Sequence, residues 1–168
     1  YVMYHTYGEP TGKKVRLHFL TGEVNGYFDI KKHKASQWQT MLKRATYKYF
    51  DVLGRNVHLT FPTESFRQYT PDGKALIDVY DRIQDLEHDF MGLNKYGKQF
   101  KNRHYCHVVN KGYMAAPNYR TVYGISTMEK VCDIKKLTGV ALWGPAHEMG
   151  HNNQQSSKVP VGRSTSFC

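Results

Sequence analysis

Two histidines four positions apart, with a glutamate directly after the first, constrain this chain more than any other feature. They lie in the segment from His147 to His151, which reads His-Glu-Met-Gly-His and fits the pattern His-Glu-x-x-His. A helix turns about 100° per residue, so residues four apart differ by only about 40° and lie one turn apart. The spacing therefore predicts a helix, over about 141–154, that presents both imidazoles on one face.

This arrangement suits a divalent metal ion. Two imidazoles on one helix face can both reach a tetrahedral zinc ion at about 2.0 Å. Glu148 points to a neighbouring face, from which it can take a proton from a metal-bound water whose pKa zinc lowers toward about 7. The residues predict one Zn²⁺ with His147 and His151 as ligands and Glu148 as general base, although two imidazoles also suit nickel, cobalt or copper. The alternative is a surface helix whose histidines make ordinary hydrogen bonds.

A third protein ligand is not evident in the sequence. Zinc peptidases use three protein ligands and leave one position for water. No Asp, Glu or His follows His151 in this chain. The remaining candidates are either weak ligands after the motif or carboxylates before it: Asn152, Asn153, Cys168, Glu129 and Asp133.

Composition is that of one globular domain. The 168 residues are 40% hydrophobic and 23% charged, with a formal net charge of +10. That charge favours an anionic partner such as an acidic glycan. The basic residues are scattered, however, and no aromatic-basic module of a nucleic-acid reader is present, so we expect a solvated basic surface and no nucleic-acid partner.

Other composition features exclude further classes of site. The three cysteines include no Cys-x-x-Cys pair, which argues against a thiolate zinc site. No segment approaches the about 20 apolar residues of a membrane span, so we expect no transmembrane segment. The chain starts at Tyr1 without a signal peptide pattern.

Strand and helix patterns alternate along the chain, which predicts an α+β fold. Alternation or β-branched and aromatic content predicts strands at 15–20, 24–30, 56–61 and 104–110. Helical spacing predicts helices at 36–50, 63–69, 127–137 and 141–154, and a long one from Pro71-Asp72-Gly73 to about Met91. On that long helix the aspartates, including Asp81, are expected to cover a solvated face. His104 and His107 would face opposite sides of their strand, which argues against a second metal site.

Several stretches together resemble a known family. These are Val24 to Asp29, Trp38, Leu53 to Pro62, Gly112 to Ala116 and Trp143 to Asn152. They resemble the enhancin-like, mucin-active gluzincin zinc peptidases, the metallopeptidase family numbered sixty. The resemblance covers nearly the whole chain up to Gln155, and His-Glu-x-Gly-His is more restrictive than His-Glu-x-x-His.

The resemblance implies a zincin-like fold and a secreted or cell-surface zinc endopeptidase that cleaves mucin-type O-glycoproteins. It implies His147 and His151 as ligands and Glu148 as base. It also implies a glutamate ligand after the second histidine, so we expect 1–168 to be one partial catalytic domain, incomplete at its C-terminus, with 156–168 as an atypical tail. Such a fragment would lack a third ligand and could be inactive.

The resemblance also implies a substrate-binding edge strand at Gly112, Tyr113, Met114, Ala115 and Ala116. An extended peptide would add to this edge, and the two small alanines would leave room for a bulky glycan. The alternative is an ordinary core strand.

Three other functions fit the same sequence. One is a catalytically inactive module of the same fold that binds glycoproteins or anionic glycans, with binding that survives EDTA. Another is a nucleic-acid binder driven by charge, with strongly salt-dependent affinity. The last is a structural domain that holds no metal.

Overall fold

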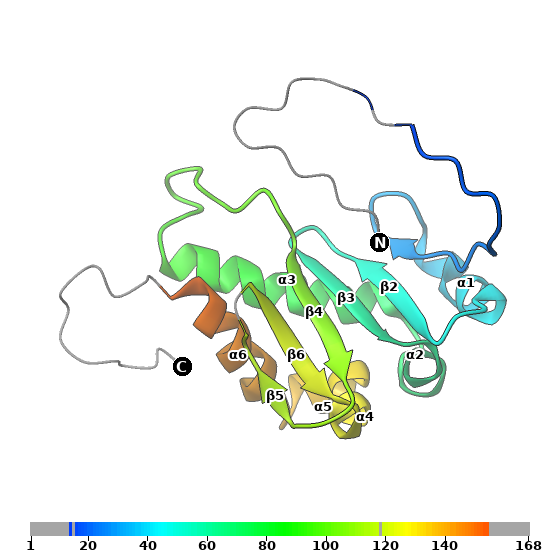
Figure 1. Cartoon of the computed structure of the whole chain (residues 1–168). Helices are drawn as coiled ribbons and strands as arrows, with labels where there is room; N and C mark the ends of the chain where they lie inside the picture. The colour runs from blue at the N-terminus through cyan, green and yellow to red at the C-terminus, as the bar shows by residue number, and fades with distance from the viewer. Residues whose placement is uncertain (1–13, 15, 118, 155–168) are drawn as a thin grey trace.

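A six-stranded mixed sheet organises the molecule, in a computed structural model that describes residues 14, 16–117 and 119–154. The strands stand in the order β1-β2-β3-β4-β6-β5 (Figure 1). Neighbours are antiparallel at β2/β3 and β5/β6 and parallel at the other three pairings. Their bounds are β1 (Phe28–Asp29), β2 (Tyr49–Leu53), β3 (Val57–Pro62), β4 (His104–Val109), β5 (Met114–Ala115) and β6 (Arg120–Gly124).

Helices connect and cover these strands, which gives the expected α+β class. Their bounds are α1 (Trp38–Arg44), α2 (Thr63–Tyr69), α3 (Gly73–Phe90), α4 (Met128–Cys132), α5 (Ile134–Thr138) and α6 (Trp143–Asn153), with short 3-10 turns η1 (Ala35–Gln37) and η2 (Ile125–Thr127). The long α3 and the C-terminal α6 lie together on one face of the sheet, behind it in Figure 1. Among the described residues, no helix combines the length and apolar character that crossing a membrane requires.

The core lies between the sheet and its helices. Strand alternation directs Val57, Leu59 and Phe61 of β3 inward, where all three are fully buried. Leu76 and Tyr80 of α3 pack against that side and are equally buried. Strand β3 is a central strand of the sheet, and α3 packs against it. Helix α3 also contacts α6 and so positions it relative to the sheet.

The expectation that Asp81 lies on a solvated face of α3 was wrong, because its side chain is completely buried. Its carboxylate accepts hydrogen bonds from the backbone N–H groups of Arg55, Asn56 and Val57, at 2.6, 2.8 and 3.0 Å. A turn that leaves three N–H groups without backbone partners needs such an acceptor. Asp81 thus connects α3 by hydrogen bonds to the turn between β2 and β3.

The N-terminal expectations were partly wrong. The described residues of the expected strand 15–20, numbers 16–20, form no strand and are exposed, and the expected strand 24–30 shrinks to β1. The expected helix 36–50 ends at Arg44, since Ala45 is extended. Residues 49–53 instead form β2, whose alternating burial lets Phe50 and Val52 enter the core while its backbone pairs with β3. Long-range pairing here overrides local helical spacing.

The middle and C-terminal expectations were mostly confirmed. Helix 63–69 is α2, residues 57–62 and 104–109 are β3 and β4, and α3 starts directly after Asp72. Strand β6 was missed. The expected helix 127–137 is divided, because Asp133 is extended and its carboxylate caps α5 through the N–H groups of Lys135 and Lys136.

Candidate functional site

Helix α6 carries the His-Glu-x-x-His motif and begins at Trp143, with Pro145 buried in its first turn. Proline fits there because first-turn N–H groups have no helical partner. Met149 is fully buried and lies two residues from each histidine, about 200° around the helix. Core packing of Met149 therefore turns His147 and His151 toward the opposite, half-buried side of the helix.

The two imidazoles meet directly. Nε2 of His147 and Nε2 of His151 lie 2.9 Å apart, and the rings are nearly perpendicular with centroids 4.4 Å apart. Two neutral imidazoles can share this contact only when one Nε2 donates and the other accepts. If neither nitrogen carries a proton, two lone pairs converge on one point, and a cation there would satisfy both.

The pair also fits a zinc ion in size. Two nitrogens bound to one tetrahedral zinc at about 2.0–2.1 Å lie about 3.3 Å apart. The observed 2.9 Å needs only a few tenths of an ångström of opening. Within residues 14, 16–117 and 119–154, no group of three or more His, Cys, Asp or Glu could hold a metal ion. The geometry thus supports two ligands and defines no third.

Glu148 is half-buried and follows His147 on the helix. Burial is the main cause of the raised pKa of the Tyr123 phenol in β6, and the charge of Glu148 is one of the smaller causes. Asn152, one helical turn after Glu148, bonds to the Arg120 carbonyl of β6, so this side of α6 lies toward the sheet. On the helix, Glu148 is displaced by about 100° from His147.

The two asparagines after the motif hold the end of α6 in place. Nδ2 of Asn152 donates to the backbone oxygens of Arg120 in β6, at 3.1 Å, and of Glu148, at 3.3 Å. Nδ2 of Asn153 donates to the carboxylate of Glu87 in α3. These contacts give both asparagines a structural role that sequence reasoning missed.

The upstream carboxylates have other partners. Glu129 forms an ion pair with Lys136, and Asp133 caps α5. His104 and His107 lie on opposite sides of β4: Nε2 of His104 contacts the Thr121 hydroxyl at 2.7 Å, whereas His107 stacks on Tyr105. The expected opposite orientation of these two histidines is what the structure shows.

Strand β5 includes two of the five residues expected to bind substrate. Met114 and Ala115 pair with Tyr123 and Val122 of β6, and β5 is the last strand of the sheet. Gly112 and Tyr113 belong to the preceding turn, and Ala116 follows the strand. The first turn of α6 packs closely on β5, because a Cβ added at Gly144 would lie 2.7 Å from the Met114 sulfur. The structure thus brings β5 beside the motif helix.

Sequence reasoning also missed Trp143. Its indole stacks on the His147 imidazole, with centroids 4.5 Å apart and planes inclined by 22°. The side chain is nevertheless 64% exposed. The four-residue spacing between Trp143 and His147 could have predicted this contact, because it continues the spacing of the two histidines.

Burial perturbs the carboxylate behind α6. It raises the pKa of Glu87 to about 7, opposed only by the hydrogen bond from Asn153. Burial also lowers the pKa of His104 to about 4, with a further contribution from His88. Between about pH 5 and pH 6 both groups are therefore mainly uncharged.

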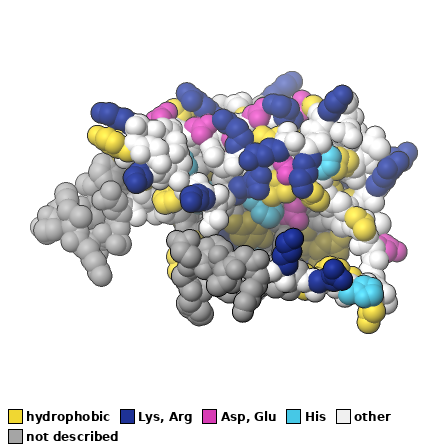
Figure 2. Space-filling model, turned by 90° about the horizontal axis from the view of Figure 1, so that it is seen from above, with side chains coloured by type: hydrophobic (Ala, Val, Ile, Leu, Met, Phe, Trp, Pro, Cys, Tyr) yellow, Lys and Arg dark blue, Asp and Glu magenta, His cyan; other side chains and the backbone are white. Residues whose placement is uncertain are grey.

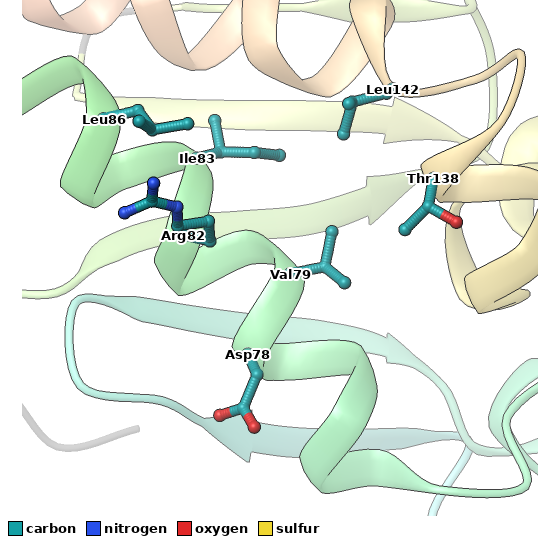
Figure 3. A pocket seen from close by; sticks show the side chains of 7 residues that line it. All are labelled: Asp78, Val79, Arg82, Ile83, Leu86, Thr138 and Leu142. Carbon is teal, nitrogen blue, oxygen red and sulfur yellow. The ribbon is translucent and has the colours of Figure 1, made fainter.

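Two surface features lie outside the motif. An apolar hollow of about 360 Å³ is lined by residues of α3, by the last residue of α5 and by the residue before α6: Asp78, Val79, Arg82, Ile83, Leu86, Thr138 and Leu142 (Figure 3). None of these is a motif residue. In the view of Figure 2, basic side chains are spread among acidic ones, as the scattered sequence positions predicted.

A family match covers this site. The model of the family described as Peptidase M60, enhancin and enhancin-like, matches residues 23–165. That range includes β5 and all of α6.

Solved structures share the fold. A metallopeptidase from Bacteroides thetaiotaomicron is 27% identical with a TM-score of 0.74, over 82% of this chain and 24% of its own. A metallopeptidase solved in complex with Tn antigen has the same identity and TM-score, over 82% of this chain and 26% of its own. The likeness therefore involves about a quarter of each of those chains.

One curated relative has a different description. It is a TRPM8 channel-associated factor homolog from Xenopus laevis, 23% identical over 133 residues. The match spans 78% of this chain and 14% of the relative.

Proposed function

Because the chain belongs to the Peptidase M60, enhancin and enhancin-like family, we propose that it forms part of the catalytic domain of a zinc-dependent endopeptidase acting on mucin-type O-glycoproteins. The observation that carries this proposal is the convergence of the two Nε2 atoms of His147 and His151 at 2.9 Å. The neighbouring edge strand β5 adds support, because it offers an extended backbone beside that pair.

His147 and His151 would hold one zinc ion. When bound, zinc supplies Lewis acidity that polarises a peptide carbonyl and makes water a stronger acid. The stack on Trp143 restrains the His147 imidazole. The buried Met149 keeps this face of α6 turned away from the core. The third ligand stays undefined by the described residues.

Glu148 would act as the general base. A carboxylate beside the histidine pair can accept a proton from the attacking water and later donate it to the leaving amine. Asn152 restrains the helix at this point, because it bonds to both the Glu148 carbonyl and β6. These hydrogen bonds hold the backbone at Glu148 in place relative to β6.

Strand β5 and its turn would position the peptide. The edge of β5 opposite β6 can pair with an extended substrate through backbone hydrogen bonds. Ala115 is exposed and small, so a glycosylated residue could pass without a steric clash. Gly112, Tyr113 and Ala116 would form the ends of this binding segment.

Two observations support a glycoprotein substrate: the ligand of a similar metallopeptidase and the net charge of this chain. The Tn antigen complex concerns a metallopeptidase of similar fold, and the net charge of +10 favours anionic glycans. A protein that acts on mucins would work outside the cell or at its surface.

A catalytically inactive binding module of the same fold is the alternative. The relative named for association with a channel favours it. Glycan binding that survives EDTA, without cleavage by the full-length parent protein, would support this alternative against the peptidase.

Replacement of Glu148 by Gln in the full-length parent protein tests the proposal. We expect cleavage of a mucin-type glycopeptide to fall by about 10²–10⁴-fold, while zinc binding through the two imidazoles is retained. Glu129→Gln is the matched control, because that carboxylate pairs with Lys136 away from the motif. Cleavage by Glu148→Gln at the wild-type rate, followed by mass spectrometry of the products, would overturn the assignment.

A further inference from the structure

Trp143 is an exposed aromatic ring directly beside the histidine pair. The residue is 64% exposed, although one face of its indole stacks on the His147 imidazole at a centroid distance of 4.5 Å. The other tryptophan, Trp38, is 1% exposed and packs among Phe28, Phe50 and Phe66. Trp143 therefore contributes most of its surface to solvent and little to the core.

The stack with His147 fixes the direction of the indole. A stack at this distance restrains both side chains. The packing of Gly144 on Met114 fixes the first turn of α6 as well. The indole of Trp143 is thus restrained on one face by His147. Its other face points away from His147, at the end of α6 that packs on β5.

A flat aromatic face with an open side suits the apolar face of a pyranose ring. The ring C–H groups of a sugar pack on an indole much as another apolar ring does, while the sugar hydroxyls stay in water. Because the ring is exposed and restrained by its stack on His147, it is available for contact with a ligand.

We propose that Trp143 is a specificity-determining residue that stacks on the sugar of an O-glycosylated substrate. This inference rests on the proposed function, because it assigns the glycan a place beside the catalytic residues. A sugar on the open indole face would lie about two ring spacings, roughly 9 Å, from the His147 ring. In this proposal the glycosylated Ser or Thr binds close to the scissile bond.

The test uses two peptides of one sequence, one carrying a single α-linked N-acetylgalactosamine on Thr and the other unmodified. Binding to the whole chain is followed by tryptophan emission and by NMR. Because Trp38 is buried, Trp143 is the tryptophan positioned to report contact. We expect the glycopeptide, and not the plain peptide, to shift the emission of the wild-type chain.

Three variants make the test specific. Trp143→Ala should weaken glycopeptide binding by roughly three- to tenfold, the factor of one aromatic contact. Trp143→Phe should recover part of the affinity. Tyr96→Ala removes another aromatic side chain, 69% exposed and beyond α3, and should leave binding unchanged.

The outcomes separate this inference from the proposed function. Equal glycopeptide affinity of Trp143→Ala and wild type overturns the inference, as does equal binding of both peptides by the wild-type chain. Co²⁺ titration of the same variants reports the histidine pair, and Trp143→Ala should still bind the ion. If Co²⁺ binds no variant while Trp143→Ala loses the glycopeptide, the sugar contact is supported and the metallopeptidase assignment is overturned.

Discussion

Removal of one imidazole should abolish metal-linked stabilisation of this chain. The perturbation is His151→Ala, compared with the wild type in the presence of Zn²⁺. The two Nε2 atoms are already 2.9 Å apart and need to separate by only about 0.4 Å to share one ion at zinc–nitrogen distances. The hydrogen bond that binding replaces contributes about 1 kcal/mol, which is small against the about 8 kcal/mol of a micromolar site.

The magnitude follows from linkage. An ion that binds only the folded chain, at about one hundred times its dissociation constant, stabilises the fold by about 2.7 kcal/mol. For a chain of this length that corresponds to a rise in Tm of roughly 5–10 °C. A single remaining imidazole in His151→Ala, or in His147→Ala, cannot form the two-ligand site, so we expect a shift close to zero.

Thermal unfolding at neutral pH, with and without Zn²⁺ and after EDTA, measures this difference. His18→Ala is the control, because it removes an exposed imidazole from the N-terminal segment and leaves the pair intact. A zinc-dependent rise that persists in His151→Ala, or the absence of any rise in the wild type, would refute the argument that the pair is a metal site.

Two further substitutions test the frame around the site by urea unfolding. Asp81→Ala leaves three turn N–H groups without their acceptor and should lower the free energy of unfolding by about 3–5 kcal/mol; a loss below about 1 kcal/mol would contradict this role. The pKa of Glu87 is raised to about 7, so the stability it contributes is present below its usual pKa of about 4.5 and is lost as pH rises through 7. Glu87→Gln should remove this loss, so that between pH 4.5 and pH 8 the wild type loses up to about 3 kcal/mol relative to the variant. A pH-independent difference would be the contrary result.

Elements with strong local signals could be predicted from the sequence. Asp72 before a long apolar stripe defines the start of α3, and its carboxylate does accept from Lys74 and Ala75. The motif helix was predicted from the four-residue histidine spacing, and it lies within the expected range. In both cases the information is contained within a few turns of one segment.

Features that depend on distant partners could not be predicted in this way. Strand β2 follows a segment of helical spacing and forms a strand because β1 and β3 pair with it. Strand β6 is short, and β4 and β5 hold it from both sides. The burial of Asp81 likewise depends on a turn about 25 residues earlier in the chain.

The candidate site shows the same division. The pairing of His147 with His151 is local and was expected, whereas the contacts of Asn152 with Arg120 and of Asn153 with Glu87 bridge distant segments. Trp143 was missed for another reason, because an aromatic residue at helical spacing is more often part of a core.

The orientation of α6 separates the positions that folding needs from the positions that carry the motif. Met149 is buried in the core, whereas His147, Glu148 and His151 are only partly buried on the other sides of the helix. Folding therefore constrains the methionine position and leaves the three chemical positions comparatively free. Substitution of the histidines and the glutamate should therefore leave the scaffold and its edge strand folded.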